Sequence, residues 1–227
     1  MEPYFSKSGV TIYHGDALDV LPEIGAGTAG TVILDPPYSF ESLSVRGRDD
    51  GAAGTSGSPV LLFHRTLLES YRILQDGGIV PMLCAWRRLP DVSYLSTLAG
   101  LRLCACVAWV KGNVGTGGLF RSSWDPVLVG SKGSPTLLDK SAVPNVINVS
   151  PVVGGEHPYE KPPELWVHFL RRIPSCVVVD PFAGLGASGV AAANCGHQWI
   201  GVEVSERFCE IAANRLRQDS LPLEVSA

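Results

Sequence analysis

The sequence has few charged residues and no long apolar segment. Charged residues make up 18% of the 227 positions and hydrophobic residues 45%, which is typical of a folded globular protein rather than a disordered or fibrous one. No apolar run approaches the roughly 20 residues that a membrane-spanning helix needs. The first ten residues, MEPYFSKSGV, lack the charged and apolar regions of a signal peptide. We therefore expect a cytoplasmic protein with no membrane partner.

Paired cysteines and a basic excess are missing as well. No Cys-x-x-Cys pair occurs, so we expect buried free thiols and no metal site or disulfide framework. The formal net charge is −4, whereas nucleic-acid binding usually leaves a basic footprint. From residue 87 to residue 132, however, only Asp91 and Asp125 oppose the basic residues. One basic face on an acidic body and ordinary solvated charge both fit this pattern. The six cysteines are Cys84, Cys104, Cys106, Cys176, Cys195 and Cys209.

The alternation of short β-rich runs with helix-length segments predicts an α/β fold, a mostly parallel sheet flanked by helices. The length fits one domain without internal repeats. Gly, Ser and charged residues dominate positions 41–58, which predicts a long loop of the kind that often acts as a lid. Expected strands lie at 10–13, 31–34, 79–84, 103–110, 126–129 (antiparallel), 176–179 and 199–202. Expected helices lie at 17–21, 61–74, 91–98, 160–170, 187–193 and 208–216, the last capped by Ser205; positions 131–155 are expected to be irregular.

A glycine turn follows the buried strand that ends near Asp180. The segment Asp180-Pro181-Phe182-Ala183-Gly184-Leu185-Gly186 leads into a helix, where the backbone can approach a ligand closely and free N–H groups are available. Glu203 ends the next strand, at about the spacing at which Rossmann-like folds place the acid that binds ribose hydroxyls. The turn lacks the three-glycine dinucleotide pattern, and no basic residue follows it. These features favour an unphosphorylated nucleoside ligand.

A second turn, Asp35-Pro36-Pro37-Tyr38, follows another buried strand and should lie at the carboxyl edge of the sheet, where open α/β sheets bind ligands. Its prolines donate no N–H bonds, so the turn presents acceptors, the Asp35 carboxylate and the Pro36 carbonyl. Two acceptors suit the two hydrogens of an exocyclic amino group. They favour a pyramidal nitrogen whose lone pair faces an incoming methyl group. Tyr38 offers a flat face on which an extruded base could stack.

Together these segments resemble the DNA amino-methyltransferases in the arrangement called the β class. Three further pieces support the resemblance: His14-Gly15-Asp16-Ala17-Leu18, His157-Pro158-Tyr159-Glu160-Lys161-Pro162 and Gly201-Val202-Glu203-Val204. The catalytic motif precedes the cofactor motif, so the chain looks like a circular permutation of the common methyltransferase order. The resemblance implies a Rossmann-like methyltransferase fold with a mostly parallel seven-stranded sheet and one antiparallel strand. The two strands that carry the motifs should lie side by side.

The resemblance also implies S-adenosylmethionine as cofactor, DNA with a flipped-out base as partner, and no metal. Asp16 and Ala17 would lie near the adenine ring of the cofactor, Lys161 near its methionine end, and Glu203 at the ribose. The catalytic residues implied are Asp35, Pro36, Pro37 and Tyr38. The cofactor-binding residues implied are Asp16, Ala17, Asp35, Lys161, Asp180, Phe182, Ala183, Gly184, Gly186, Ser188, Glu203 and Val204. The nucleic-acid-binding candidates are Tyr38, Arg46, Arg48, Lys111 and Arg121.

The expected organisation is a single methyltransferase domain over residues 1–227. A catalytic half takes up about 10–130, a target-recognition segment about 112–155 and a cofactor half about 156–220. The recognition segment is small for the family, so sequence specificity is expected to be short, relaxed or supplied by a partner. A homodimer or a companion specificity protein fits this expectation. The resemblance implies a bacterial or phage-encoded enzyme of DNA modification, of the restriction–modification type.

The leading interpretation is methylation at N6 of adenine. Cytosine-N4 methylation uses the same geometry, but Asp at the first motif position favours adenine because the cytosine enzymes more often have Ser there. Cytosine-C5 methylation needs a cysteine nucleophile, usually in a Pro-Cys turn, and the sequence has no Pro-Cys dipeptide. A methyltransferase of RNA or of protein amide, and a non-catalytic nucleic-acid-binding subunit, remain alternatives.

Overall fold

The computed structural model describes residues 1–36, 59–112, 119–139, 141–156 and 159–217. Several predicted features therefore lie outside the described residues. They are the loop at 41–58, Pro37, Tyr38, Arg46, Arg48, and the His157-Pro158 pair.

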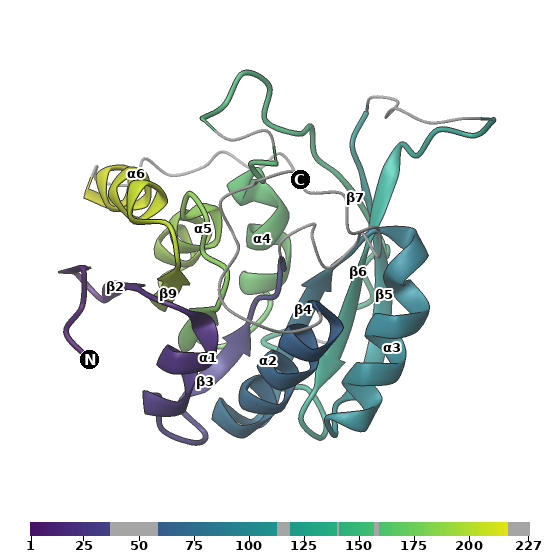
Figure 1. Cartoon of the computed structure of the whole chain (residues 1–227). Helices are drawn as coiled ribbons and strands as arrows, with labels where there is room; N and C mark the ends of the chain where they lie inside the picture. Colours follow the sequence, from purple (N-terminus) through teal and green to yellow (C-terminus); the bar gives the residue numbers. More distant parts are fainter. Residues whose placement is uncertain (37–58, 113–118, 140, 157–158, 218–227) are drawn as a thin grey trace.

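Nine described strands form one sheet in the order β1-β2-β9-β8-β3-β4-β6-β5-β7 (Figure 1). Strands β2, β9, β8, β3 and β4 run parallel to one another, and β6 is antiparallel to both of its neighbours. Both motif-bearing halves of the sequence thus contribute strands to a single sheet. The strands are β1 (Phe5–Lys7), β2 (Val10–His14), β3 (Ala29–Val32), β4 (Leu74–Leu83), β5 (Arg102–Val110), β6 (Trp124–Ser131), β7 (Val146–Asn148), β8 (Val177–Asp180) and β9 (Gln198–Glu203).

The predicted α/β class, with a mostly parallel sheet of Rossmann-like order, is confirmed. The antiparallel strand expected at 126–129 is β6. The strand count is larger than expected because two three-residue strands, β1 and β7, pair with the outer strands of the sheet. Three residues are too few to show the alternation of apolar and polar side chains that marks a strand in a sequence. For the same reason β7 falls in the segment expected to be irregular.

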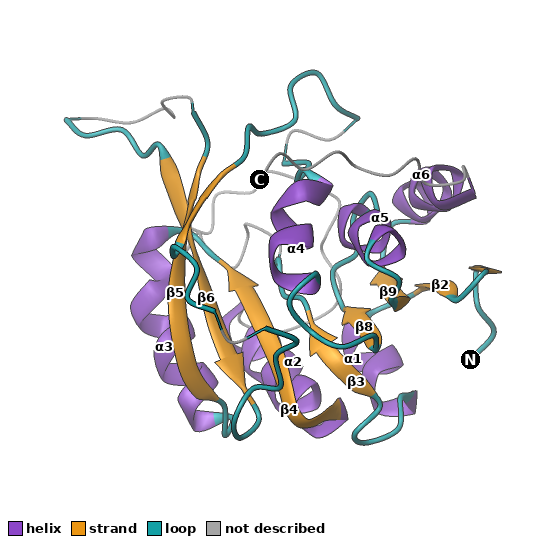
Figure 2. Ribbon diagram, turned by 180° about the vertical axis from the view of Figure 1, so that it is seen from behind, coloured by secondary structure: helices purple, strands orange, loops and turns teal. Residues whose placement is uncertain are grey.

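Helices cover both faces of the sheet (Figure 2). One face carries α1 (Ala17–Val20), α2 (Pro59–Ile73) and α3 (Leu89–Leu98). The other face carries α4 (Pro163–Leu170), α5 (Ala187–Asn194) and α6 (Glu206–Arg217). A short 3-10 helix, η1 (Leu21–Glu23), precedes the loop before β3, and a second one, η3 (Trp86–Arg88), precedes α3. The result is the three-layer arrangement that buries both faces of a parallel sheet.

The period-two alternation of side chains divides the core into two clusters. On the segment that leads to Asp35, Val32 and Leu34 join the cluster beneath α1, α2 and α3. Ile33 between them joins the cluster beneath α4, α5 and α6. All three side chains are fully buried. The central strands are therefore fixed from both sides, which also fixes the turns that follow them.

The expectation that all the cysteines are buried is wrong for Cys104 and Cys106, whose side chains are exposed. Both lie on β5, which pairs on its outer side with β7 only from Ala108 to Val110. Among the described residues no strand covers the remainder of that side of β5. Sequence alone showed an apolar run but not its position near the sheet edge.

None of the helices in the described part of the chain has the length and apolar character of a membrane span.

The close approach of Gly201 to Trp199 generates a stability prediction. The Trp199 side chain is fully buried, and a Cβ atom at Gly201 would lie 1.9 Å from its Cη2. We expect Gly201→Ala to lower the free energy of unfolding by about 1–3 kcal/mol, because the indole has to move within a packed core. Urea unfolding checks this. Gly15→Ala is the control, since among the described residues a Cβ there meets only Val20, at 3.4 Å; equal stability of both variants would contradict the explanation.

Candidate active site

The two motif-bearing strands are neighbours. Strand β3 pairs in parallel with β8, with Val32 opposite Val179. The Ile33 N–H continues this pairing beyond β3 by donating to the Val179 carbonyl at 2.9 Å. Parallel strands end at the same edge of a sheet, so the Asp35 turn and the loop after Asp180 leave the sheet side by side. The predicted adjacency of the two motifs is confirmed.

The backbone before Asp35 is held by β4 on its other side. Leu34 bridges Met82, its N–H donates to the Pro81 carbonyl at 2.9 Å, and its carbonyl accepts the Leu83 N–H at 2.9 Å. The Pro36 residue is buried, whereas the Asp35 side chain keeps 21% of its surface exposed. The sheet therefore presents one carboxylate at its edge from a rigid backbone.

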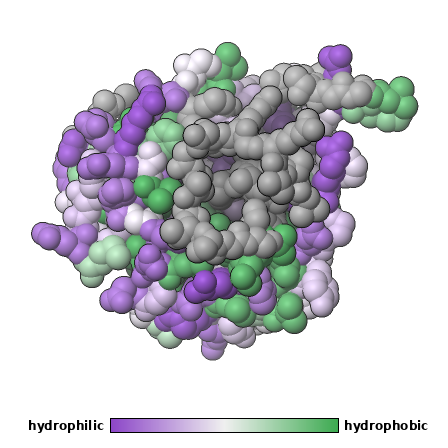
Figure 3. Space-filling model, viewed as in Figure 1, coloured by the Kyte–Doolittle hydropathy of each residue, from purple (hydrophilic) through white to green (hydrophobic). Residues whose placement is uncertain are grey.

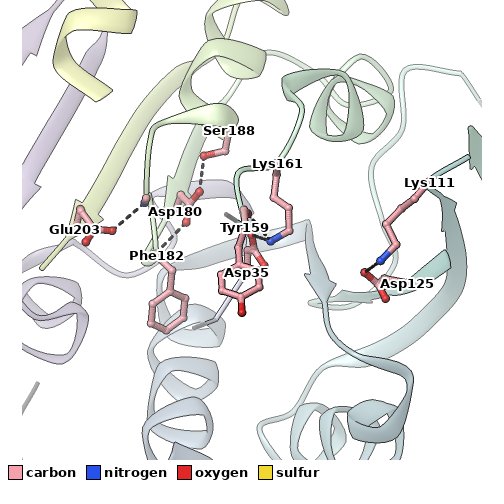
Figure 4. Close-up of polar contacts among 10 residues, drawn as sticks. Asp35, Lys111, Asp125, Tyr159, Lys161, Asp180, Phe182, Ser188 and Glu203 are labelled. Carbon is pink, nitrogen blue, oxygen red and sulfur yellow. Dashed lines mark hydrogen bonds and ion pairs between the residues drawn. The ribbon is translucent and has the colours of Figure 1, made fainter. Parts of the chain in front are cut away.

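Lys161 reaches this carboxylate from the segment before α4. Its ammonium lies 3.0 Å from Asp35 Oδ2 and donates to the Tyr159 carbonyl at 3.1 Å (Figure 4). The Lys161 side chain is only 7% exposed. Removing one partner of such a pair leaves a buried charge uncompensated, which is strongly destabilising. The residue expected near the methionine end of a cofactor thus contacts the catalytic motif directly.

Asp180 is buried at the end of β8 and organises the glycine loop. Its Oδ1 accepts the Phe182 N–H at 2.9 Å, and its Oδ2 accepts the Ser188 hydroxyl proton (Figure 4). The Ser188 oxygen in turn accepts the Trp199 indole N–H at 3.1 Å. This chain of hydrogen bonds fixes the start of α5 to β8 and β9. Asp180 therefore holds the glycine loop in place through its hydrogen bonds to Phe182 and Ser188.

Burial raises the pKa of Asp180 from 3.8 to about 7. The hydrogen bonds from Ser188 and Phe182 oppose the increase, and the negative charges of Asp35 and Glu203 add to it. These Coulombic contributions indicate that the three carboxylates share one electrostatic environment. Such a group of acids disfavours an anionic ligand and favours a cationic one.

Glu203 closes the other side of the loop. Its Oε2 accepts the Gly184 N–H at 2.9 Å, and its Oε1 accepts the Ser205 N–H at 2.8 Å. Burial raises the pKa of this carboxyl group, and the backbone hydrogen bonds oppose the increase. Each carboxylate oxygen has a second lone pair. Glu203 can therefore hold its own loop and still accept hydrogen bonds from a ligand diol.

The loop between these acids has a backbone that favours glycine. Gly184 has φ of 51° and Gly186 has φ of 78°, both in the left-handed region that side chains rarely adopt. Among the described residues, a Cβ at Gly184 would meet nothing closer than the Phe182 carbonyl at 3.9 Å. Within that part of the chain, the space beside the Gly184 backbone is open. Ala183 beside them is buried, and Phe182 is partly exposed.

The opening segment of the chain joins the same region through β2. The Gly15 N–H donates to the Glu203 carbonyl at 3.0 Å, so this segment lies beside the end of β9. The Asp16 carboxylate caps α1 by accepting the Leu18 N–H at 2.8 Å. Ala17 is buried and Val204 is exposed. Three of the predicted cofactor segments therefore converge around Glu203.

Two of the predicted nucleic-acid residues are described, Lys111 directly after β5 and Arg121 shortly before β6. Lys111 forms an ion pair with Asp125 at 2.8 Å and lies away from Asp35, Asp180 and Glu203 in Figure 4. Arg121 is exposed. Both residues were assigned to nucleic acid by charge, and their role stays a prediction.

Two contacts of the site were not foreseen. The first is the pairing of Lys161 with Asp35, described above. The second is Arg215 on α6, which pairs with Glu160 at 2.7 Å and donates to the Leu185 carbonyl at 3.2 Å. Arg215 thereby links the segment of Lys161 to the glycine loop. Its position in the last turn of a helix gave no signal beyond favourable interaction with the helix dipole.

Comparisons with known proteins agree with this arrangement. Residues 116–214 match the family model of N6 and N4 methyltransferases, described as DNA methylase. The DNA adenine methyltransferase YhdJ of Escherichia coli (strain K12) is 23% identical over 263 residues, which cover 93% of this chain and 84% of that protein. Other relatives carry the name type II methyltransferase. The predicted resemblance to the DNA amino-methyltransferases is confirmed.

Two solved structures share the fold. The complex of M1.HpyAVI with S-adenosylmethionine has a TM-score of 0.71 at 19% identity, and the match covers 91% of this chain and 98% of that one. The cytosine-N4-specific PvuII DNA methyltransferase has a TM-score of 0.74 at 19% identity, with 99% and 90% covered. At this identity the likeness establishes the methyltransferase fold and leaves the target base open.

The raised pKa of Asp180 predicts how stability depends on pH. The folded protein holds this proton more tightly than the unfolded chain, so the stabilisation is complete below about pH 4 and is lost as pH rises through 7. Relative to Asp180→Asn, the wild-type free energy of unfolding should fall by about 2–3 kcal/mol between pH 5 and pH 8. Urea unfolding without ligand measures it. The exposed Asp19→Asn is the control; parallel curves for wild type and Asp180→Asn would contradict the assignment.

Proposed function

We propose that this chain, whose residues 116–214 match the N6/N4 DNA methylase family model, transfers a methyl group from S-adenosylmethionine to N6 of adenine in DNA. One observation carries the proposal: the Asp35 turn and the glycine loop leave adjacent parallel strands at the same edge of the sheet. This arrangement holds an acceptor for an amine next to a loop that is open to a nucleoside.

S-adenosylmethionine supplies a methyl group on a positively charged sulfonium. The acidic surroundings of Asp180, Asp35 and Glu203 suit that charge, and no basic residue between 181 and 195 is present to hold a phosphate. In this proposal Glu203 binds the ribose hydroxyls while the backbone of residues 182–186 lines the nucleoside. Asp16, Ala17 and Val204 border the adenine side. Ser188 and Asp180 hold the loop in place.

The chain's part in the chemistry is positioning and electrostatic stabilisation. The Asp35 carboxylate and the Pro36 carbonyl each accept a hydrogen bond from one N–H of the target amino group. These two hydrogen bonds direct the nitrogen lone pair toward the methyl group. Lys161 keeps the Asp35 carboxylate in place through the 3.0 Å ion pair to its Oδ2. Alignment of this kind supplies a large part of the barrier reduction in transfer reactions. As nitrogen develops positive charge, the nearby carboxylate stabilises it.

The choice of adenine over cytosine rests on Asp at the first motif position and on relatives named for adenine. The fold is shared with a cytosine-N4-specific enzyme, so cytosine N4 is the second candidate. The test is transfer from labelled cofactor to unmodified duplex DNA, RNA, free nucleosides and protein, followed by nucleoside analysis. The proposal expects N6-methyladenine in DNA. N4-methylcytosine, or label in RNA or protein alone, would overturn it.

The proposed setting is the bacterial cytoplasm, with duplex DNA as partner and a flipped-out base in the pocket. The proposal assigns Tyr38 to stacking on that base, and Arg46, Arg48 and Arg121 to phosphates, whereas Lys111, the other candidate from the sequence, is paired with Asp125. Residues 112–155 form the proposed recognition segment. A homodimer or a companion protein would enlarge the DNA contact. Sequencing of modified bases in DNA from expressing cells identifies the recognised site.

The role of Asp35 predicts a separation of turnover from cofactor binding. We expect Asp35→Ala to abolish methyl transfer, because the amine loses its charged acceptor. Cofactor affinity should fall by no more than about tenfold, because one acid beside the sulfonium is lost while Glu203 and the loop of residues 182–186 still hold the nucleoside. Single-turnover assays and calorimetry measure the two effects. Thermal unfolding checks that the variant stays folded after the carboxylate beside Lys161 is removed. The control is Asp91→Asn, which also removes a carboxylate from a buried cation, here Arg88 at 2.9 Å. A loss of affinity as severe as the loss of turnover would refute the role.

The role of Glu203 predicts the opposite pattern. We expect Glu203→Gln to weaken cofactor binding by roughly tenfold or more, because hydrogen bonds to a charged acceptor are strong, while the rate at saturating cofactor changes little. Calorimetry checks the affinity, and thermal unfolding checks that the loop contacts to Gly184 and Ser205 persist. Exposed Glu206→Gln, three residues along the chain, serves as the control. Unchanged affinity in Glu203→Gln would remove the ribose assignment.

A further inference from the structure

Two adjacent large apolar residues stand almost entirely in solvent at the tip of the β5–β6 hairpin. Leu119 is 92% exposed and Phe120 is 90% exposed, more than any other exposed large hydrophobic residue of the described chain. The space-filling view shows this projecting tip as a hydrophobic surface (Figure 3). Scattered apolar residues are ordinary on a surface, whereas a contiguous apolar pair on a protruding element marks a contact site.

The tip projects from the same edge of the sheet as the active site. Strand β6 pairs with β4 only up to Val127 opposite Leu83, yet it continues to pair with β5 up to Trp124 opposite Val110. The hairpin therefore rises beyond the end of β4, as Figure 1 shows. Phe120 lies seven positions before Val127 in the chain, which allows a reach of at most about 23 Å beyond the edge. That distance is comparable to the width of a DNA duplex.

The stem beneath the tip is held by several contacts. The Lys111 N–H donates to the Ser123 carbonyl at 2.9 Å, and its ammonium pairs with Asp125 at 2.8 Å. The Trp109 indole N–H donates to the Val149 carbonyl at 2.8 Å, which ties the stem to the segment after β7. An element anchored in this way can press its tip into a partner instead of folding back.

The chemistry of the tip fits the base stack of a duplex. The apolar pair is followed directly by exposed Arg121, so an insertable side chain stands next to a cation that suits a phosphate. A stable protein interface buries about 800 Å² on each partner, far more than two side chains can supply. Separating two base pairs, by contrast, takes only one or two apolar side chains.

We propose that Leu119 and Phe120 form a wedge that enters duplex DNA and occupies the space left when the target nucleotide turns into the Asp35 pocket. This inference rests on the proposed function, since it requires a base that leaves the stack. The wedge offsets part of the cost of unstacking, which is smallest for a base that is already unpaired. Its contribution should therefore depend on how the target base is paired.

The test compares the double variant Leu119→Ala/Phe120→Ala with wild type on short duplexes that carry the methylation site found by sequencing. One duplex is fully paired, and the other has an abasic position opposite the target base. We expect kcat/KM to fall roughly tenfold or more on the paired duplex and to stay within about threefold of wild type on the abasic one. With 2-aminopurine as the target base, the fluorescence increase on binding should be lost in the variant on paired DNA only.

Two single variants serve as controls. Tyr94→Ala removes a 69% exposed aromatic side chain from α3, and Leu98→Ala removes a 57% exposed apolar side chain from the end of the same helix, outside the proposed recognition segment. Both should behave as wild type on both duplexes. Equal losses of the wedge variant on the two duplexes, no loss on either, or a paired-specific loss in either control variant would each overturn the wedge. Wild-type protein that methylates no DNA would instead overturn the proposed function.

Discussion

The parallel pairing of β3 with β8 is the constraint on which the rest of the site depends. It brings the end of the segment before Asp35 beside the end of β8, although the two segments are far apart in the chain. Because the strands are buried on both faces by two separate clusters, neither turn can shift without disturbing a packed core. The adjacency of the Asp35 turn and the glycine loop after Asp180 is thus a consequence of sheet order and not of loop flexibility.

The charged side chains of the site determine which ligands it favours at the positions that the sheet defines. Burial raises the pKa of Asp180 to about 7, and the negative charges of Asp35 and Glu203 add to the increase. Lys161 is the cation that compensates the charge of Asp35. A region with this balance accepts a cationic donor beside an amine more readily than a phosphorylated nucleotide. The three residues also differ in their contacts, since Asp180 and Ser188 hold the loop while the Asp35 side chain is 21% exposed at the edge of the sheet.

The sequence allowed the fold class and the principal site segments to be predicted because the motifs directly follow buried strands. Asp35 and Asp180 stand at strand ends, and their adjacency follows from the parallel order that β-rich runs and helices imply. What could not be predicted depends on three-dimensional neighbours. The pairing of Lys161 with Asp35 joins distant segments, and the exposure of Cys104 and Cys106 reflects a sheet edge that β7 covers only in part. The projection of Phe120 likewise follows from unequal strand lengths.

The most direct measurement of the central claim is a crystal structure with S-adenosylmethionine bound. The account predicts the ribose hydroxyls on Glu203, the nucleoside along residues 182–186, and the methyl group facing Asp35 across a gap that one amino nitrogen can fill, at about 3 Å from each. A ribose bound away from Glu203, or a methyl group directed away from Asp35, would contradict the account.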